Sequence, residues 1–501
     1  MKKIVYLPLD ERPCNYEFPE ALFGGEHNII RPPLDIMGRK KTPAPTDKIE
    51  QWFEANAKTA DAIIVSVDTL IYGGIVPSRL HHLSEEQISK KLAVLKRVRK
   101  ANSKAVIYAF SLIMRCPQYS SADEEPDYYE KCGREIFLKG EYLHKQELGI
   151  ITAGEKAELI KIEKKIPPKD YADYMQRRAV NLKVNTEVID LLKANVFDFL
   201  IIPQDDAAVF GHTAKDQAIV RRHIKHNALQ SKVYMYPSAD DTGLTLFARA
   251  VNIFAKKHPK VFVMYSSHNG MNIVPSYEDR PLGETIKYQL LAAGCIKWDN
   301  PDTADMILCV NAPSRKMREA IYQNPCREYD TERTLIDFCE LIEEFIRISK
   351  PVMIGDVAYA NGGDLELASI LEQKKLLTKL ASYAGWNTSS NTLGTCIAQG
   401  VNYLMHGATK KHLSFLALRY LEDIGYCSSV RLDVKNNDLQ RLGYDYYLTD
   451  GHRGKVSKMI KAKIEKFAQE YFPSIAGNIR IKDCYMPWNR MFEVGLDVEY
   501  I

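Results

Sequence analysis

The chain has 501 residues, 46% of them hydrophobic and 26% charged, which is the composition of a globular protein with a large buried core. Lysine and arginine number 68 against 64 aspartates and glutamates, so the net charge is only +4 and no long basic run occurs. This balance argues against nucleic acid and against a membrane surface as partners. No apolar stretch approaches the 18 or more residues of a membrane span, so we expect a soluble protein.

The first predicted element is a β-strand formed by the apolar run at residues 4–9. Lys2 and Lys3 precede this run as they would in a signal peptide, but the run is short and Asp10 follows at once. The ten cysteines are scattered and form no CxxC pair, which is typical of free thiols in a reducing compartment. We therefore expect a cytoplasmic protein.

Nine short apolar runs recur along the chain, and most are separated by helical patterns such as residues 85–101 and 243–258. They are nearly continuous in hydrophobicity, which indicates strands buried on both faces of a parallel sheet. The runs are residues 3–10, 61–68, 105–115, 197–206, 232–241, 260–269, 304–313, 351–361 and 379–387.

The alternation of strands and helices predicts an α/β fold. Eight or nine strands favour a (β/α)8-like barrel of parallel strands, and the alternative is an open doubly wound sheet. Residues 123–193 are polar, charged and helical, and are predicted as an insertion between the third and fourth strands. In residues 406–501 the alternation of apolar runs and helical patterns changes, and the new pattern predicts a small α+β C-terminal domain. Residues 1–405 would then form the barrel-like catalytic domain.

Polar residues follow these strands one after another, where ligand sites of parallel α/β sheets lie. As single residues, Asp and Asn are equally well explained as helix caps. Caps do not explain the histidine, arginine and tryptophan at the same edge. The expected substrate-binding residues are Asp10, Arg12, Asp68, Asp240, Asp241, His268, Asn269, Asp356, Asn361, Trp386, Asn387, Asn391, Trp488 and Arg490.

The acid doublet Asp205-Asp206 is the most informative pattern, because it directly follows a strongly apolar strand. Two adjacent carboxyl groups repel each other, which raises the pKa of one of them. One protonated and one ionised carboxyl group is what cleavage of a glycosidic bond requires. The expected catalytic residues are therefore Asp205, which orients the substrate or stabilises charge, and Asp206, the general acid, as in hexosaminidases that use the substrate's acetamido group.

Trp386 and Asn387 lie in a segment that could offer a stacking face beside amides, a common way to hold a pyranose ring. Trp488 and Arg490 could complete the rim of such a site. Core packing explains the tryptophans as well. The sequence thus favours a small molecule or an oligosaccharide as the substrate of a glycoside hydrolase or related carbohydrate-processing enzyme, with no cofactor.

Two alternatives stay open. A metal-dependent hydrolase could bind a divalent ion through acids and histidines of the same edge, although no HxH follows the first strand and HExxH is absent. A non-catalytic sugar-binding protein could use the same polar residues at the strand ends to bind a sugar without cleaving it. The candidate metal ligands are Asp206, His212, Asp240, His268 and Asp356.

Four segments together resemble a bacterial family catalogued as domain of unknown function 4127. They are YLPLDERPCN at the start, IIPQDDAAVFG in the centre, YAGWNTSSNTLG, and PWNRMFE near the end. The resemblance covers essentially the whole chain. It implies no activity and no catalytic residue, but it places several candidate residues in signature segments: Asp10, Arg12, Asp205, Asp206, Trp386, Asn387, Trp488 and Arg490.

Overall fold

The computed structural model describes residues 1–501, and the chain divides into two compact units. Unit 1 consists of Met1–Glu11, Gly24–Gly243 and Tyr277–Asp279. Unit 2 consists of Arg12–Phe23, Leu244–Ser276 and Arg280–Ile501. The chain therefore passes from one unit to the other five times.

Unit 1 is built on a six-stranded sheet with the order β2-β1-β3-β4-β5-β6, in which all neighbours are parallel. Residues of β3 and β5 are all buried, as expected for strands covered on both faces. The strands are β1 (Lys3–Leu7), β2 (Asn28–Ile30), β3 (Ala62–Ser66), β4 (Val106–Phe110), β5 (Phe199–Gln204) and β6 (Val233–Pro237).

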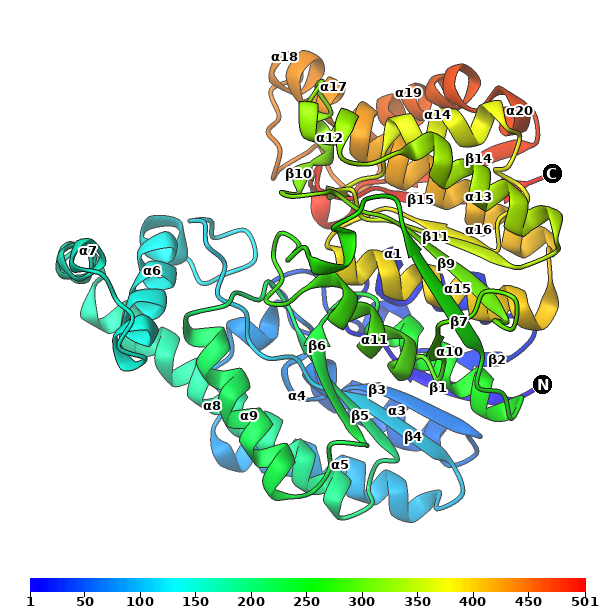
Figure 1. Cartoon of the computed structure of the whole chain (residues 1–501). Coiled ribbons are helices and arrows are strands. Elements are labelled where there is room, and N and C mark those ends of the chain that lie inside the picture. Colours follow the sequence, from blue (N-terminus) through cyan, green and yellow to red (C-terminus); the bar gives the residue numbers. More distant parts are fainter. The chain divides into compact units, whose positions relative to one another are not determined.

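The helices of unit 1 connect successive strands, and residues 123–193 hold three of them with no strand. These three have a small core of their own, which includes Tyr129, Ile136 and Tyr174. Figure 1 shows α6 and α7 at one end of α8, away from the sheet. The helices are α3 (Thr46–Ala57), α4 (Val67–Tyr72), α5 (Glu85–Ala101), α6 (Tyr129–Glu147), α7 (Ala153–Glu163), α8 (Pro168–Lys193) and α9 (His212–His226).

Unit 2 is built on a five-stranded parallel sheet with the order β8-β7-β9-β11-β13. Counted along the chain this is the order 2-1-3-4-5, the same as the first five strands of unit 1. It is the flavodoxin-like form of a doubly wound sheet. The strands are β7 (Lys260–Tyr265), β8 (Ile296–Trp298), β9 (Met306–Asn311), β11 (Val352–Asp356) and β13 (Ser382–Ala384).

Short strands and many helices complete unit 2. β10 (Arg318–Glu319) pairs with β12 (Tyr359–Ala360), and an antiparallel pair, β14 (Ile479–Tyr485) and β15 (Gly495–Tyr500), lies near the C-terminus. The helices are α1 (Pro13–Tyr16), α2 (Phe18–Phe23), α10 (Thr242–Phe254), which starts in unit 1, α11 (Leu282–Ala292), α12 (Arg327–Thr331), α13 (Leu335–Arg347), α14 (Leu365–Gln373), α15 (Ser389–His406), α16 (Lys410–Arg419), a π-helix (Tyr420–Val430), α17 (Arg431–Val434), α18 (Gln440–Leu442), α19 (Lys455–Tyr471) and α20 (Pro473–Ala476).

Residues 406–501 do not form a compact unit of their own. Ile460 of α19 and Ile481 of β14 belong to the same hydrophobic core as Ile307 of β9 and Ile354 of β11. The change in the pattern of strands and helices after residue 406 thus marks a part of unit 2 that packs onto the sheet. It does not mark the small separate domain expected from the sequence.

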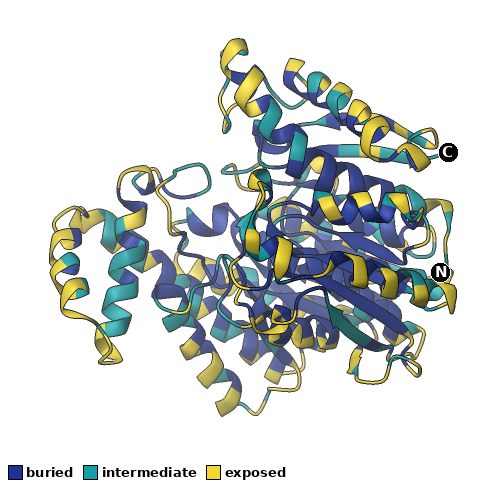
Figure 2. Ribbon diagram, turned by 45° about the horizontal axis from the view of Figure 1, so that its top comes forward, coloured by how far each residue is buried: buried dark blue, intermediate teal, exposed yellow.

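The strands form two open sheets and not the (β/α)8-like barrel that the strand count favoured. The alternative, an open doubly wound sheet, describes each unit. Figure 2 shows most strands of the two sheets in the colour of buried residues, whereas β7 is mostly in the colour of intermediate ones. In each sheet, the loops after the carboxyl ends of the strands are where a ligand is expected to bind.

Candidate functional site

A cluster of two arginines and four acids lies at the carboxyl edge of the unit 1 sheet. Asp205 and Asp206 follow β5 directly, and Arg115 comes five residues after the end of β4. Arg79 ends the 3₁₀ turn Pro77–Arg79 that follows α4. Glu124 and Glu125 come from the loop between β4 and α6. We call these six residues the acid–arginine cluster.

The two arginines share the carboxyl groups of the cluster. Arg79 donates to Asp205 at 2.7 Å, and Arg115 donates to Asp206 at 3.0 Å. Arg115 also donates to Glu125 at 2.7 Å, and its Nη1 lies 3.8 Å from Asp205. Both guanidinium groups reach Glu124, at 3.0 and 3.1 Å. Four carboxyl groups thus share two positive charges, which makes complete ionisation of the cluster unfavourable.

Asp206 holds its proton more tightly than a solvated carboxyl group does. Removal from water and the adjacent Asp205 raise the pKa of Asp206 to about 7, and Arg115 opposes this shift without cancelling it. The Asp206 side chain is still 16% exposed, so a substrate can reach it. Its backbone has a φ of +41°, a conformation that non-glycine residues rarely adopt. Such strain persists where the surrounding structure holds it, often at functional sites.

Asp68 lies beneath the same edge, in the first turn of α4 directly after β3. Burial raises the pKa of its carboxyl group to about 7. Its Oδ2 accepts the backbone N–H of Leu112 at 3.0 Å, which ties α4 to the segment that leads to Arg115. The side chain is 3% exposed, so it does not face a substrate.

The other unit 1 residues expected in the site are also buried. Asp10 follows β1 and is 4% exposed. Asp240 and Asp241 follow β6, and Asp241 accepts the hydroxyl of Ser238 at 2.6 Å within its own turn. Asp241 also accepts the backbone N–H of Ala239 at 3.4 Å, so these contacts hold the turn between β6 and α10.

In unit 2, Asp356 is the centre of a buried polar network. It accepts the amide of Asn311 at 2.9 Å, the hydroxyl of Tyr383 at 2.7 Å and the backbone N–H of Asp364 at 2.7 Å. Asp364 in turn pairs with the guanidinium of Arg333. Burial, and then the nearby Asp364, raise the pKa of Asp356 to about 7. These contacts all join residues of unit 2, which indicates a role in holding the strand ends together.

The tryptophan segment after β13 is packed and not open. Trp386 is 4% exposed, and its ring meets Phe18 edge to face at 6.5 Å. The carbonyl of Asn387 accepts the N–H of Asn361 at 2.9 Å, and both asparagines have positive φ. Asn391 lies in the first turn of α15 and donates its N–H to Thr388. This is the core-packing explanation of Trp386.

Trp488 is stacked between two cations. The guanidinium of Arg12 lies 4.4 Å from the ring centroid and that of Arg490 lies 4.5 Å from it. Arg490 also pairs with Glu493 at 3.0 Å. Arg12, Trp488 and Arg490 are each at most 5% exposed. The ring and the two charges interact with one another inside unit 2 and are largely closed to a ligand.

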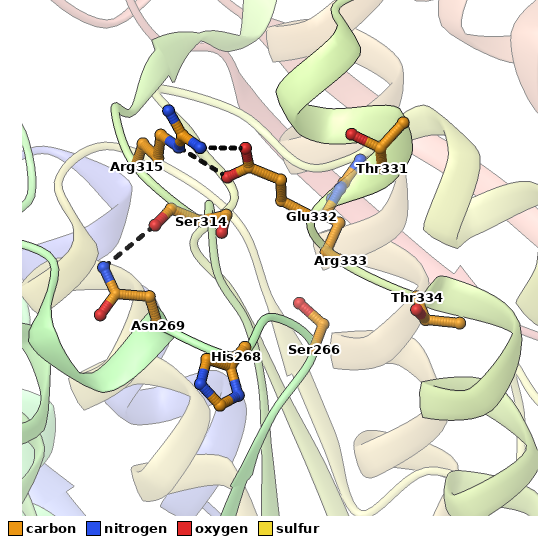
Figure 3. A pocket seen from close by; sticks show the side chains of 9 residues that line it. All are labelled: Ser266, His268, Asn269, Ser314, Arg315, Thr331, Glu332, Arg333 and Thr334. Atoms are coloured by element: carbon orange, nitrogen blue, oxygen red, sulfur yellow. Dashed lines mark hydrogen bonds and ion pairs between the residues drawn. The ribbon is translucent and has the colours of Figure 1, made fainter.

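The remaining two expected residues, His268 and Asn269, follow β7 and line a pocket of about 520 Å³ in unit 2 (Figure 3). The residues expected to share one cavity are therefore distributed over two sheets. Asp10, Asp68, Asp206 and Asp241 follow strands of unit 1. His268, Asp356 and Asn387 follow strands of unit 2.

The candidate metal ligands do not converge. No group of three or more histidine, cysteine, aspartate or glutamate side chains is placed to hold a metal ion. His212 packs against Tyr171 and Tyr174, and burial lowers its pKa to about 3. The carboxyl group of Asp206 is bonded to Arg115, which a cation would have to displace.

Sequence reasoning missed Arg79, Glu124 and Glu125 as members of the cluster. Arg79 lies in a turn beyond α4, and the two glutamates belong to the charged stretch interpreted as the start of the insertion. The available signal was the doublet Glu124-Glu125, a second pair of adjacent acids like Asp205-Asp206.

The sequence matches the family described as Protein of unknown function (DUF4127) over residues 4–497. The chain belongs to this family. No curated protein matches the chain. No helix combines the length and the apolar composition needed to cross a membrane.

Proposed function

We propose that this member of the family is a carbohydrate-processing hydrolase that cleaves a glycosidic bond at the acid–arginine cluster. The observation that carries the proposal is the raised pKa of Asp206 beside a second carboxyl group. Asp205 pairs with Arg79 at 2.7 Å and Asp206 pairs with Arg115 at 3.0 Å, yet burial and the adjacent Asp205 raise the pKa of Asp206 to about 7, so that it holds its proton up to neutral pH. A general acid works best when its pKa lies near the working pH.

In this proposal Asp206 donates its proton to the leaving oxygen of the glycosidic bond. Asp205 orients the substrate or stabilises the positive charge that develops on the sugar ring. Oxygens of both carboxyl groups lie within 4 Å of Arg115 Nη1, at 3.8 and 3.0 Å. Both carboxyl groups therefore face the same guanidinium group.

The arginines hold the acids of the cluster in place. Arg79 and Arg115 are 3% and 8% exposed, so their charges are weakly screened by solvent. Arg79 contacts Asp205 and both glutamates, and Arg115 contacts all four acids. Burial, and then the adjacent Asp205, keep the proton on Asp206 against the effect of both arginines. The proposal does not need the tryptophans, because the packed Trp386 and Trp488 offer no open stacking face.

The test measures hydrolysis of a panel of aryl glycosides, including N-acetylhexosaminides, by wild type and by Asp206→Asn. Removal of a positioned proton donor should reduce turnover by about 10²–10⁴-fold. The loss should be much smaller for a leaving group that needs no proton. Asp205→Asn should instead lose activity on every leaving group, because its role does not depend on the leaving oxygen.

Asp216→Asn is the matched control. Asp216 also pairs with an arginine, Arg178, and its side chain is 16% exposed like that of Asp206. It lies on α9, outside the cluster. This variant should keep full activity. A fully active Asp206→Asn enzyme would remove the proposed general acid, and activity that disappears on chelation and returns with a divalent ion would favour the metal-dependent alternative.

A further inference from the structure

The acid–arginine cluster carries more negative than positive charge. Its four carboxyl groups face two guanidinium groups, so with Asp206 protonated three negative charges stand against two positive ones. Neighbouring cations of unit 1 pair with acids outside the cluster, Arg177 with Asp173 at 2.7 Å and Lys40 with Asp123. The charges of the cluster itself thus sum to one negative charge, in a place where solvent screens it weakly.

Glu125 lacks a hydrogen-bond donor within the cluster. Its Oε1 accepts from Arg115 at 2.7 Å and from Arg79 at 3.3 Å, so the carboxyl group lies between the two guanidinium groups. Its Oε2 has no hydrogen-bond partner, although the side chain is only 1% exposed. Buried polar atoms normally have a partner, because an unsatisfied one costs free energy, and more so when it is charged. A donor brought by a ligand would supply that partner.

The cluster has an open side with an aromatic residue next to it. Asp205, Asp206 and Glu124 have side chains between 14% and 18% exposed, so a ligand can enter on their side. Tyr119, from the same loop as the glutamates, is 42% exposed. Arg115 acts to lower the pKa of its hydroxyl, but burial of the hydroxyl and the carboxyl group of Asp206 raise it. The hydroxyl is thus close to Asp206, while the ring is open to a ligand.

An ammonium group would supply both the charge and the donor that the cluster lacks. It brings one positive charge, which balances the cluster while the proton stays on Asp206. It also brings three N–H donors, and Oε2 of Glu125 needs one. A metal ion fits less well, because no group of three or more histidine, cysteine, aspartate or glutamate side chains is placed to hold one.

We propose that the substrate of this site is an amino sugar with a free amino group, which enters the cluster as an ammonium ion. The ammonium group donates to carboxyl groups on the glutamate side of the cluster, and the sugar ring packs against Tyr119. An N-acetylated sugar carries no charge and would leave the cluster unbalanced. This inference rests on the proposed function, because it names the substrate class of the same site.

The first measurement is calorimetric binding of three sugars to the full chain. Glucosamine, N-acetylglucosamine and glucose differ only at one carbon, which carries an ammonium, an acetamide or a hydroxyl group. Glucosamine should bind roughly tenfold or more tightly than the other two, because its contact with a carboxylate is charge-assisted. Glu125→Gln removes the charge and keeps the shape, so it should weaken binding of glucosamine by roughly tenfold and leave that of glucose unchanged.

Asp127→Asn is the matched control for the loss of one negative charge. Asp127 belongs to the same loop, pairs with Lys41 at 3.1 Å and has a side chain 98% exposed. The variant should bind glucosamine as wild type does. If Glu125→Gln melts below wild type, Glu124→Gln tests the same charge at a more exposed acid of the cluster. Tyr119→Ser should weaken all three sugars alike, because the ring contacts what they share.

The second measurement is hydrolysis of the aryl glycosides of the same three sugars, so that the two proposals can fail separately. Preferred binding of glucosamine and preferred cleavage of its glycoside support both. Preferred binding without cleavage of any glycoside supports the amino-sugar site and contradicts the hydrolase. Cleavage of the glucoside or the N-acetylglucosaminide at an equal or higher rate overturns the amino-sugar proposal and leaves the hydrolase.

The amino-sugar proposal is also overturned if none of the three sugars binds or if all three bind equally. It is overturned, too, if Glu125→Gln and Glu124→Gln both melt like wild type and keep the full preference for glucosamine, or if Asp127→Asn loses that preference.

Discussion

Asp206 links the chemistry of the cluster to the stability of the protein. Its pKa is about 7 in the folded chain and near 3.8 when the carboxyl group is fully solvated. The folded state therefore holds a proton that the unfolded state releases between these two values. The stability that this group contributes is present at acidic pH and is lost as the pH rises through about 7.

Asp206→Asn should therefore change stability in a pH-dependent way. Near pH 4 the variant should melt close to wild type, because both side chains are neutral. At pH 8.5 it should melt higher, by roughly 2–4 °C for each 1 kcal/mol of relieved cost in a unit of this size. Melting temperatures measured across this range check the sign. A variant less stable than wild type at pH 8.5 would mean that the pair with Arg115 outweighs the cost of charging Asp206.

At the residue scale, the sequence located the acid doublet but not the partners that control it. The position of Asp205-Asp206 follows from the apolar strand before it, which is a local pattern. Arg79 and Glu125 come close to the doublet only through the fold, and neither follows a strand directly. Trp386 was located by the sequence but misinterpreted. A tryptophan beside amides has the same local sequence whether its ring is packed in the core or open to a ligand.

At the scale of elements, Arg333 connects the start of α13 with the strand ends of unit 2. Its guanidinium is 2% exposed, pairs with Asp364 and lies 3.3 Å from the amide oxygen of Asn311. It also stacks on Tyr329, with 4.9 Å between guanidinium and ring centroid. Asp364 caps α14, so one ion pair joins two helices to the polar network around Asp356.

Arg333→Met should destabilise unit 2 strongly, because it leaves the buried Asp364 without its counter-charge. Loss of one partner of a buried pair costs about 3–5 kcal/mol. Urea unfolding followed by fluorescence measures the change. The double variant Arg333→Met/Asp364→Asn should recover part of the loss, and the exposed Arg347→Met should change little. A single variant as stable as wild type would show that the pair adds no net stability.

The strands that the sequence missed explain why it favoured a barrel. All nine apolar runs correspond to strands, whereas β2 and β8 are three-residue edge strands with partly exposed residues. Each is the second strand of its sheet, and these two positions distinguish the order 2-1-3-4-5. A local sequence pattern does not show whether two successive strands pair with each other. The boundary between the two sheets, which lies between β6 and β7, therefore depends on long-range packing.

At the scale of the whole molecule, several buried acids lower the stability of the folded protein as the pH rises. Burial raises the pKa of Asp68, Asp206 and Asp356 to about 7 and that of Asp423 to about 8. Each of these groups contributes stability that is lost as the pH rises through its folded-state pKa. Ion pairs that hold the pKa of Glu155 and Glu499 near 2 act oppositely, since their contribution is lost on acidification.

Wild type should accordingly be most stable in mildly acidic solution, and its melting temperature should decrease between pH 6 and pH 8.5. Differential scanning calorimetry in buffers of constant ionic strength checks this. The decrease should be smaller in Asp206→Asn, which lacks one of the contributing groups. A melting temperature that stays constant or increases over this interval would contradict the assignment of protons to these buried acids.

The five passages of the chain between the units have a consequence for biosynthesis. Residues 12–23 belong to unit 2, and their aromatic rings pack there, Phe18 on Trp386 and Phe23 on Phe247. On the ribosome this segment emerges more than two hundred residues before its partners, while the rest of the emerging chain belongs to unit 1. Domains fold as they emerge, so this apolar segment must wait exposed through the folding of unit 1. For the same reason neither unit can be produced as one uninterrupted fragment.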